Sequence, residues 1–447
     1  IEAIVGPGDG LRVSMDIDPK LPPEGYSLEV ASDSIVLRGA DPDGLFYAGQ
    51  TLLQILAFEE KEIELRKITD WPRYKTRELM VDMGRSVYSM SLLKRVVRIM
   101  ARLKLNSLHL HLYDDEANSL RFDNLPLGSE NTWAISIGQL RQLVAYANQY
   151  HVTVVPELEC WGHAGSILHH YPELYGAPGM WGGYSFGIGE EFYSLIEKIL
   201  DEVVPVLDEE CSVHLGLDEA NWAILPSAKN APEGTYTPEK LVGRLYDILQ
   251  KVGKRHSRKP HMRIWADHGG RPIPQEIRRK VITEPWQYFR HKEQDIKDKV
   301  AKFGAAGEPQ FMMGAGMSSS HLQGAYEATR IWCREAAKVP NVEGVDICMW
   351  ESNDVASHLI GIYAGAACAW SPDSFEPAEE DTYGEQLHGR LLAKMKRWQN
   401  IFTDAADKSI RMDMGEEAYR GFFVSGPLAG KPVSPNALRE KPVFFKA

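Results

Sequence analysis

The chain has 447 residues and a formal net charge of -12, with 44% hydrophobic and 25% charged residues. This balance is typical of a folded globular protein, and the length exceeds what one hydrophobic core usually supports, so we expect one large domain with smaller appendages. The acidic charge disfavours nucleic acids and anionic membrane surfaces as partners, because such polyanions are bound by basic patches. No stretch approaches the roughly 18 consecutive apolar residues of a membrane span.

Five cysteines occur without a CxxC spacing. An odd number in this arrangement disfavours a disulfide framework and a zinc ribbon, and it favours a reducing compartment. The chain begins IEAIVGPGDG, which has neither the positive region nor the apolar core of a signal peptide. We therefore expect a cytoplasmic location for the chain as it stands, which lacks an initial Met.

Residues 25–56 combine two short strand patterns with a helical one. Apolar and polar residues alternate over 26–30 and 35–37, and the intervening Ser-Asp-Ser predicts the turn of a hairpin. Apolar residues then recur at helical spacing between Leu45 and Leu56. We expect a small α+β domain over residues 1–67.

From Trp71 onward, short apolar or β-branched runs alternate with amphipathic helical patterns, as in successive βα units. The eight predicted strands lie at residues 78–83, 107–112, 152–158, 212–217, 262–266, 281–284, 311–314 and 345–349. Ser91 is the expected N-cap of the helix after the first strand. Eight repeats predict a (β/α)8 barrel over 68–375, followed by a C-terminal helical extension over 376–447. A doubly wound sheet is the alternative, but no GxGxxG follows the first strand.

The predicted strand ends are rich in carboxylates and aromatic rings, and barrel active sites lie at the carboxyl ends of the strands. The candidate site residues are Arg77, Asp114, Asp115, His163, Asp218, Glu219, Trp265, Trp286, Tyr288, Trp350 and Glu351. Carboxylates and arginine bind hydroxyl groups, and indole rings stack on the apolar faces of pyranoses, so the set predicts a sugar site. Each tryptophan alone more often packs in a core, and an Asp-Glu pair often starts a solvated helix. Asp218 and Glu219, however, directly follow the apolar run HLGL.

His109 and His111 occupy positions i and i+2 of a predicted strand, so they share one face. Such a pair could hold a metal ion. We expect instead that hydrogen bonds inside the barrel satisfy both imidazoles, and we assign no metal ligand and no cofactor.

Four stretches, in this order and spacing, resemble successive strand motifs of glycoside hydrolase family 20, the β-N-acetylhexosaminidases: ITDWPRYKTRELMVDMGR, KLNSLHLHLYDD, VPELECWGHA and VHLGLDEA. The earlier GLFYAGQTLLQIL resembles the end of that family's small domain. Together the matches span residues 25–370. The resemblance implies a retaining mechanism in which the substrate's own 2-acetamido oxygen attacks the anomeric carbon and forms an oxazolinium ion.

The same resemblance implies roles for the candidate residues. Asp218 would orient the acetamido group, and Glu219 would protonate the leaving oxygen, with its pKa raised by burial and the adjacent anion. Arg77 would bind the 3- and 4-hydroxyls of the terminal sugar. Asp114 or Asp115 and His163 would support the acid, while Trp265, Trp286 and Trp350 would wall the sugar ring.

The chain departs from the family pattern at several positions, which indicates a divergent branch. It has HLGLDE for HIGGDE, Arg77-Glu78 for RG, and Glu159 where an aspartate is common. The run 311–317 lacks the seventh-strand tyrosine of many members, for which Tyr288 is a candidate replacement. We expect an exo-acting enzyme that releases terminal β-linked GlcNAc or GalNAc from glycans or glycoconjugates. The alternatives are a glycosidase for another sugar, such as unacetylated β-glucosamine, and a barrel that binds glycans without cleaving them.

Overall fold

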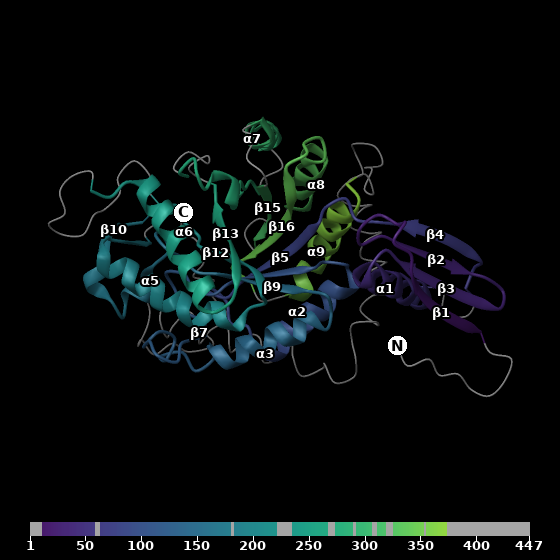
Figure 1. The fold of residues 1–447 in the computed structure, drawn as a ribbon, viewed down its shortest axis with the longest axis horizontal. Coiled ribbons are helices and arrows are strands. Elements are labelled where there is room, and N and C mark those ends of the chain that lie inside the picture. The colour runs from purple at the N-terminus through teal and green to yellow at the C-terminus, as the bar shows by residue number, and fades with distance from the viewer. Residues whose placement is uncertain are drawn as a thin grey trace, which may run out of the picture.

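The computed structural model describes residues 11–58, 63–179, 183–220, 235–266, 273–288, 292–305, 311–318, 325–352 and 355–372. A small α+β unit lies at one end of the molecule and a parallel barrel with its helices forms the rest (Figure 1). The expected C-terminal extension, 376–447, lies outside the described residues. The side chains of the seventh strand, whose missing tyrosine Tyr288 is predicted to replace, also lie outside the described residues.

The small unit is a four-stranded sheet with one helix packed on it. Its elements are β1 (Arg12–Ile17), β2 (Tyr26–Val30), β3 (Ser34–Gly39), α1 (Pro42–Phe58) and β4 (Arg66–Asp70), with sheet order β1-β3-β2-β4. The predicted hairpin is confirmed as antiparallel β2 and β3, whose Leu28 and Leu37 lie opposite each other and are buried. Strand β1 was not predicted, and β4 carries the sheet slightly past the expected boundary at residue 67.

Eight parallel strands close into a barrel, as the sequence predicted. They are β5 (Thr76–Asp82), β6 (Ser107–His111), β9 (Thr153–Glu157), β12 (Glu210–His214), β13 (Lys259–Trp265), β14 (Val281–Glu284), β15 (Phe311–Ser318) and β16 (Val342–Trp350). Strand β16 pairs with β5 and completes the ring. An open doubly wound sheet is therefore excluded, because such a sheet would leave two edge strands.

Helices surround the barrel (Figure 1). They are α2 (Met90–Arg102), α3 (Ile137–Asn148), α4 (Gly165–Leu168), α5 (Glu190–Val203), α6 (Pro238–Arg255), α7 (Glu293–Ala305), α8 (Ala325–Ala336) and α9 (Val355–Trp370). Two short sheets, β7 (Leu120–Arg121) with β8 (Ile135–Ser136) and β10 (Tyr175–Pro178) with β11 (Tyr184–Phe186), lie in the connecting loops. The N-cap of α2 is Ser89, whose hydroxyl accepts from the Leu92 N–H at 3.2 Å; the prediction of Ser91 was wrong, since Ser91 already lies in the first turn.

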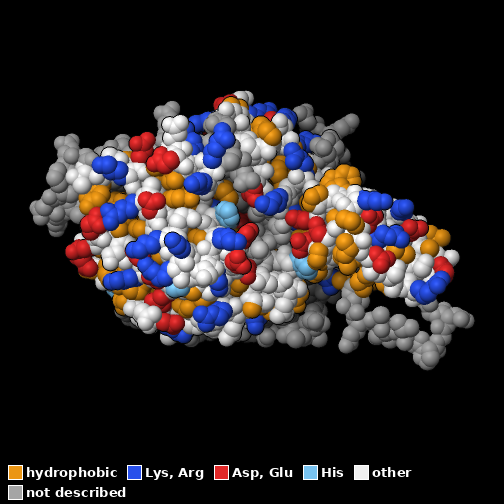
Figure 2. Space-filling model, viewed as in Figure 1, with side chains coloured by type: hydrophobic (Ala, Val, Ile, Leu, Met, Phe, Trp, Pro, Cys, Tyr) orange, Lys and Arg blue, Asp and Glu red, His pale blue; other side chains and the backbone are white. Residues whose placement is uncertain are grey.

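The five cysteines are buried free thiols. None of the helices in the described part of the chain combines the length and hydropathy that a membrane crossing requires. On the face shown in Figure 2, Lys and Arg side chains are interspersed with Asp and Glu.

Candidate active site

Polar and aromatic side chains converge at the carboxyl end of the barrel. The last residues of the strands there are Asp82 of β5, His111 of β6, Glu157 of β9, His214 of β12, Trp265 of β13 and Trp350 of β16. Because parallel strands all end at the same rim, the loops that follow them bring residues far apart in sequence into one site.

Asp218 and Glu219 reach this site through a bent segment after β12. Gly216, Leu217 and Glu219 have φ angles of 62°, 76° and 46°. Such left-handed values are unfavourable for residues other than glycine, and they gather at functional sites. A Cβ on Gly216 would lie only 1.9 Å from the Glu159 carboxylate. The side chain of Asp218 is 12% exposed and that of Glu219 is 25% exposed, so the second acid is the more open one.

His163 connects both acids to a second pair of carboxylates. Its Nε2 lies 3.3 Å from Glu219 Oε2 and 3.6 Å from Asp218 Oδ2, while its Nδ1 lies 3.1 Å from Asp114 Oδ1. Burial alone would lower the pKa of His163, but Asp114 and Asp218 outweigh burial and raise that pKa well above its ordinary value. His163 is therefore an imidazolium facing Glu219 at neutral pH.

Asp114 and Asp115 have different surroundings although they are adjacent. Asp114 is buried, and its Oδ2 lies 2.7 Å from His111 Nε2 and 2.7 Å from Arg85 Nη2. Burial would raise the pKa of Asp114, but Arg85 and His163 hold it well below its ordinary value. Asp115 Oδ1 instead accepts the backbone N–H groups of Gly165 and Tyr184, each at 2.9 Å, and so joins two loops.

Arg77 does not reach this site, and its prediction as a sugar ligand was wrong. It is the second residue of β5, at the amino end of the barrel, and it is fully buried. Its Nη2 donates to Glu24 at 2.6 Å and to the Tyr47 hydroxyl at 2.9 Å, and its Nε donates to the Lys104 carbonyl at 2.8 Å. Arg77 therefore joins the small unit to the amino end of the barrel, opposite to the rim where barrel sites lie.

The arginine at the site is Arg85, which was not predicted from the sequence. Its Nη1 lies 3.3 Å from Asp82, its Nη2 2.7 Å from Asp114 and its Nε 3.4 Å from Glu116. The guanidinium carbon is 5.6 Å from the centre of the Trp350 ring. The available signal was position, because Arg85 follows the first predicted strand whereas Arg77 precedes it.

Glu159 is a further acid that was not among the predicted site residues. It is fully buried, and its Oε2 accepts the Leu217 N–H at 3.3 Å. Burial raises the pKa of Glu159 well above its ordinary value, and the carboxylates of Asp218 and Glu157 raise it further. Glu159 is thus a neutral acid that packs beneath the bend leading to Asp218.

Four of the predicted aromatic and acidic residues lie together at the same rim. Trp350 Nε1 donates to the Tyr288 hydroxyl at 2.9 Å, and Tyr288 stacks on Trp286 with ring centres 5.2 Å apart. These three rings are half-buried. Glu351 follows Trp350 with a φ of 58°, and its N–H donates to Asp82 at 3.0 Å.

Trp265 lies beneath that aromatic group. It is 1% exposed, and its Nε1 donates to Glu157 Oε1 at 2.5 Å. Its ring belongs to the barrel core in this structure, and not to the open wall expected from the sequence.

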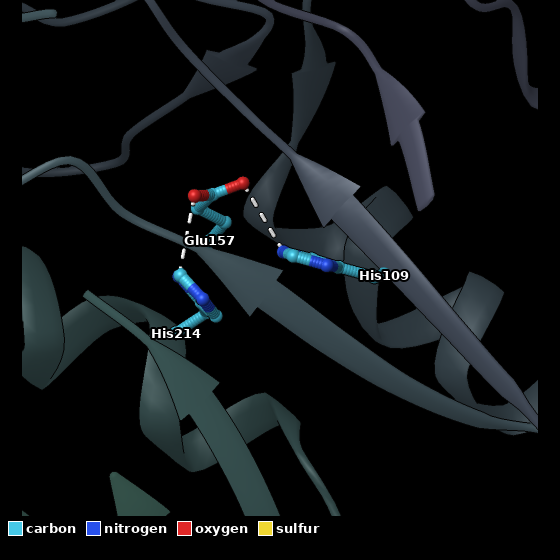
Figure 3. Close-up of side chains that lie close together, drawn as sticks. All are labelled: His109, Glu157 and His214. Carbon is cyan, nitrogen blue, oxygen red and sulfur yellow. Dashed lines mark ion pairs between the residues drawn. The ribbon is translucent and has the colours of Figure 1, made fainter. Parts of the chain in front are cut away.

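The expectation that hydrogen bonds satisfy both strand histidines is confirmed for His111, whereas at His109, among the residues that the structure describes, only Nδ1 is hydrogen-bonded and Nε2 is not. His109 Nδ1 lies 2.8 Å from Asp346, and His111 Nδ1 lies 2.6 Å from Glu157. Figure 3 shows Glu157 between His109 and His214: one Glu157 oxygen lies 3.1 Å from His109 Nε2 and the other 3.2 Å from His214 Nδ1. Burial lowers the pKa of His214 to about 4, so His214 is neutral.

Comparison with known proteins gives the family. The model described as "Glycosyl hydrolase family 20, catalytic domain" matches residues 74–394, and "Glycosyl hydrolase family 20, domain 2" matches residues 5–71. A beta-hexosaminidase of Porphyromonas gingivalis is 30% identical over 56% of this chain and 37% of its own length. One from Akkermansia muciniphila is 30% identical over 48% and 49%, so the chain spans less than half the length of either relative.

Solved structures agree in fold. A beta-N-acetylhexosaminidase from Bacteroides fragilis superimposes with a TM-score of 0.68 at 23% identity, over 87% of this chain and 84% of that one. One from Streptomyces coelicolor gives a TM-score of 0.65 at 21% identity, over 88% and 84%. Since the catalytic-domain match covers the whole barrel and the acids at its rim, the chain belongs to glycosyl hydrolase family 20.

Proposed function

We propose that this protein is an exo-acting retaining β-N-acetylhexosaminidase that removes terminal GlcNAc or GalNAc from glycans. The observation that carries the proposal is the placement of Glu219 against the His163 imidazolium, with Asp218 beside both, at the carboxyl end of the barrel. The relatives named beta-hexosaminidase support the same activity.

Glu219 is the general acid in this proposal. Its proton passes to the glycosidic oxygen as the bond from that oxygen to the anomeric carbon breaks. The carboxylate left behind faces His163 Nε2 at 3.3 Å, so a positive charge is already in place where negative charge develops. Its greater exposure relative to Asp218 suits contact with a leaving group.

Asp218 orients the 2-acetamido group, whose carbonyl oxygen attacks the anomeric carbon in place of an enzyme nucleophile. Positive charge develops on the acetamido nitrogen in this step, and the Asp218 carboxylate offsets it. Water then opens the oxazolinium ion, with Glu219 accepting a proton from that water.

The remaining rim residues would hold the terminal sugar. Arg85, and not Arg77, is the candidate for the sugar hydroxyls, because its guanidinium lies beside Trp350 at the rim. Trp350, Tyr288 and Trp286 supply ring faces for stacking, and Glu351 lies next to them. Asp114 would hold His163 in position against Glu219. Asp115 would hold together the two loops whose N–H groups it accepts.

A β-glucosaminidase acting on unacetylated sugar is the second candidate, and the charge of the site favours it. The carboxylates of Asp82, Asp114, Asp115 and Asp218 outnumber the cations Arg85, His111 and His163 around Glu219, where burial raises the pKa of Glu116 to about 8 and keeps it neutral. An ammonium group on C2 would gain from that excess.

A panel of aryl β-glycosides of GlcNAc, GalNAc, glucosamine and 6-sulfated GlcNAc separates these functions. Hydrolysis of the N-acetylated sugars together with inhibition by GlcNAc-thiazoline, a mimic of the bicyclic intermediate that should bind more tightly than substrate, is the expected result. Preference for glucosamine would favour the second candidate, and binding without hydrolysis would indicate a glycan-binding barrel. A sugar trapped covalently on a carboxylate by a fluorosugar would contradict the substrate-assisted mechanism.

A further inference from the structure

An unbroken series of carboxylates and imidazoles runs from the barrel interior to the candidate acid. Its members alternate in type and come from different strands and loops. The series runs in the order Asp346, His109, Glu157, His111, Asp114, His163 and Glu219.

The inner half lies inside the barrel. Asp346 of β16 lies 2.8 Å from His109 Nδ1 of β6, and His109 Nε2 lies 3.1 Å from Glu157 Oε2 of β9. The same Glu157 oxygen lies 2.6 Å from His111 Nδ1. All four side chains are buried, and Figure 3 shows His109 and Glu157 facing each other across neighbouring strands.

The outer half carries the series up to the rim. His111 Nε2 lies 2.7 Å from Asp114 Oδ2, and the other oxygen of Asp114 lies 3.1 Å from His163 Nδ1. His163 Nε2 then faces Glu219 at 3.3 Å. Every imidazole in the series has a carboxylate oxygen at each of its two nitrogens.

Charges alternate along the series. Burial would lower the pKa of His111, but Glu157 and Asp114 outweigh it and raise that pKa to about 10; His109 and His163 are raised in the same way. Burial would raise the pKa of Glu157, but the imidazolium groups of His111 and His109 hold it well below its ordinary value. In a dry interior each charge depends on its two neighbours, because an unpaired buried ion is strongly destabilising.

A metal site at His109, Glu157 and His214 explains these contacts less well, although their donor atoms lie within 4.8 Å of one another. His214 Nδ1 accepts the Gly216 N–H at 3.0 Å, and Glu157 accepts the Trp265 N–H at 2.5 Å. A metal ligand must be a neutral imidazole with a free lone pair, whereas His109 is held as an imidazolium between two carboxylates.

We propose that Glu157 and His111 are positioning residues for the reaction, which hold Asp114, and through it His163, charged and aimed at Glu219 when Glu219 gives up its proton. The inference rests on the proposed function. In that step the Glu219 proton goes to the leaving oxygen, the glycosidic bond breaks, and no proton moves along the series. The inner residues act by keeping the imidazolium opposite the new carboxylate.

The test uses Glu157→Gln and His111→Asn with aryl β-N-acetylglucosaminides that range from an activated dinitrophenol to an unactivated phenol. A weakened His163 charge makes Glu219 a weaker acid, so kcat/KM for the phenol substrate should fall about tenfold more than for the dinitrophenol substrate. KM should change little. The alkaline limb of the pH–kcat/KM profile should move to higher pH, since a less stabilised Glu219 carboxylate holds its proton longer.

The substrate ratio is measured within one preparation, so it does not depend on the fraction of molecules that fold. Asp346→Asn, at the far end of the series, should give a smaller change in the same direction. Thr283→Val is the control, because Thr283 is buried on β14 but lies on the opposite side of that strand from Glu284, whose carboxylate faces the barrel interior. Its ratio should equal that of the wild type.

Equal losses on both substrates, with an unmoved alkaline limb, would overturn the inference. Such a result leaves the proposed function intact if Glu219→Gln in the same series loses the phenol substrate selectively. If the wild type hydrolyses neither substrate, or if Glu219→Gln is not selective, the proposed function fails instead.

Discussion

Glu219 is the most exposed of the carboxylates that lie against His163: 25% of its side chain is exposed, against 16% for Asp115 and 12% for Asp218. We predict that Glu219→Gln reduces turnover of substrates with poor leaving groups by about 100- to 10,000-fold, because these require protonation, and that activated phenols are much less affected. Steady-state kinetics on the two substrate types measures this. Glu191→Gln, on the exposed face of α5, is the control and should be silent. Equal losses of turnover on both substrate types would contradict the assignment of Glu219 as the general acid.

Arg77, which is buried, and Arg85, which is partly exposed, allow a comparison of the two ends of the barrel. Arg85→Met should reduce kcat/KM by about 10- to 100-fold through a higher KM, because charged hydrogen bonds to the sugar are lost. Arg77→Met should leave KM unchanged but lower the free energy of unfolding by about 3 kcal/mol, because Glu24 loses its buried partner. Kinetics and denaturant unfolding on both variants test the pair. A higher KM for Arg77→Met would contradict this prediction and indicate that Arg77 binds the sugar.

The turn after β12 is the element that presents both acids. Its Gly216 has a φ of 62° and lies against the Glu159 carboxylate. Gly216→Ala should destabilise the protein by at least about 1–2 kcal/mol from backbone strain alone, and it should also lower kcat by displacing Asp218 and Glu219.

Gly138 in the first turn of α3 is the matched control for that turn. A Cβ there would meet nothing closer than Ser136 Oγ at 3.7 Å. Gly138→Ala should therefore stabilise the protein by about 0.5–1 kcal/mol and leave activity unchanged. Thermal unfolding and steady-state kinetics on both variants measure these effects. Equal changes in Tm and kcat for Gly216→Ala and Gly138→Ala would contradict the prediction.

Stability of the whole molecule should depend on pH through the buried imidazoles. The folded pKa of His111 is about 10 against an ordinary value of 6.5, so its stabilisation is present below about pH 6.5 and is lost as pH rises toward 10. Glu284 and Asp346, with folded pKa values raised by burial to about 7 and about 6, add a loss of stability as pH rises through the acidic range.

Lys104 acts in the opposite direction. Burial lowers the folded pKa of Lys104 to about 8 from an ordinary value of 10.5, so its contribution to the stability of the protein increases between pH 8 and 10.5. The three imidazoles with raised pKa values together lose more stability over this range than Lys104 adds. We therefore predict that Tm falls between about pH 6.5 and 10, and that His111→Asn flattens this slope. A Tm that rises over the same interval would contradict the charged state of the imidazoles.

The sequence by itself determined the order of the barrel strands, the β2–β3 hairpin and the pair of acids that follows β12. All eight barrel strands and the β2–β3 hairpin follow from periodicity, which depends on neighbours two to four residues away and is visible along the chain. Asp218 and Glu219 stood out for the same local reason, since they directly end an apolar run.

Only the tertiary structure decided which polar groups meet. Arg77 and Arg85 are eight positions apart yet lie at opposite ends of β5, and a strand direction plus barrel closure is needed to separate them. His109 pairs with Asp346 because β16 returns to close the ring beside β5. A buried charge is stable only beside an opposite charge. Because these partners come from strands that are distant in sequence, local sequence patterns do not predict which charges pair.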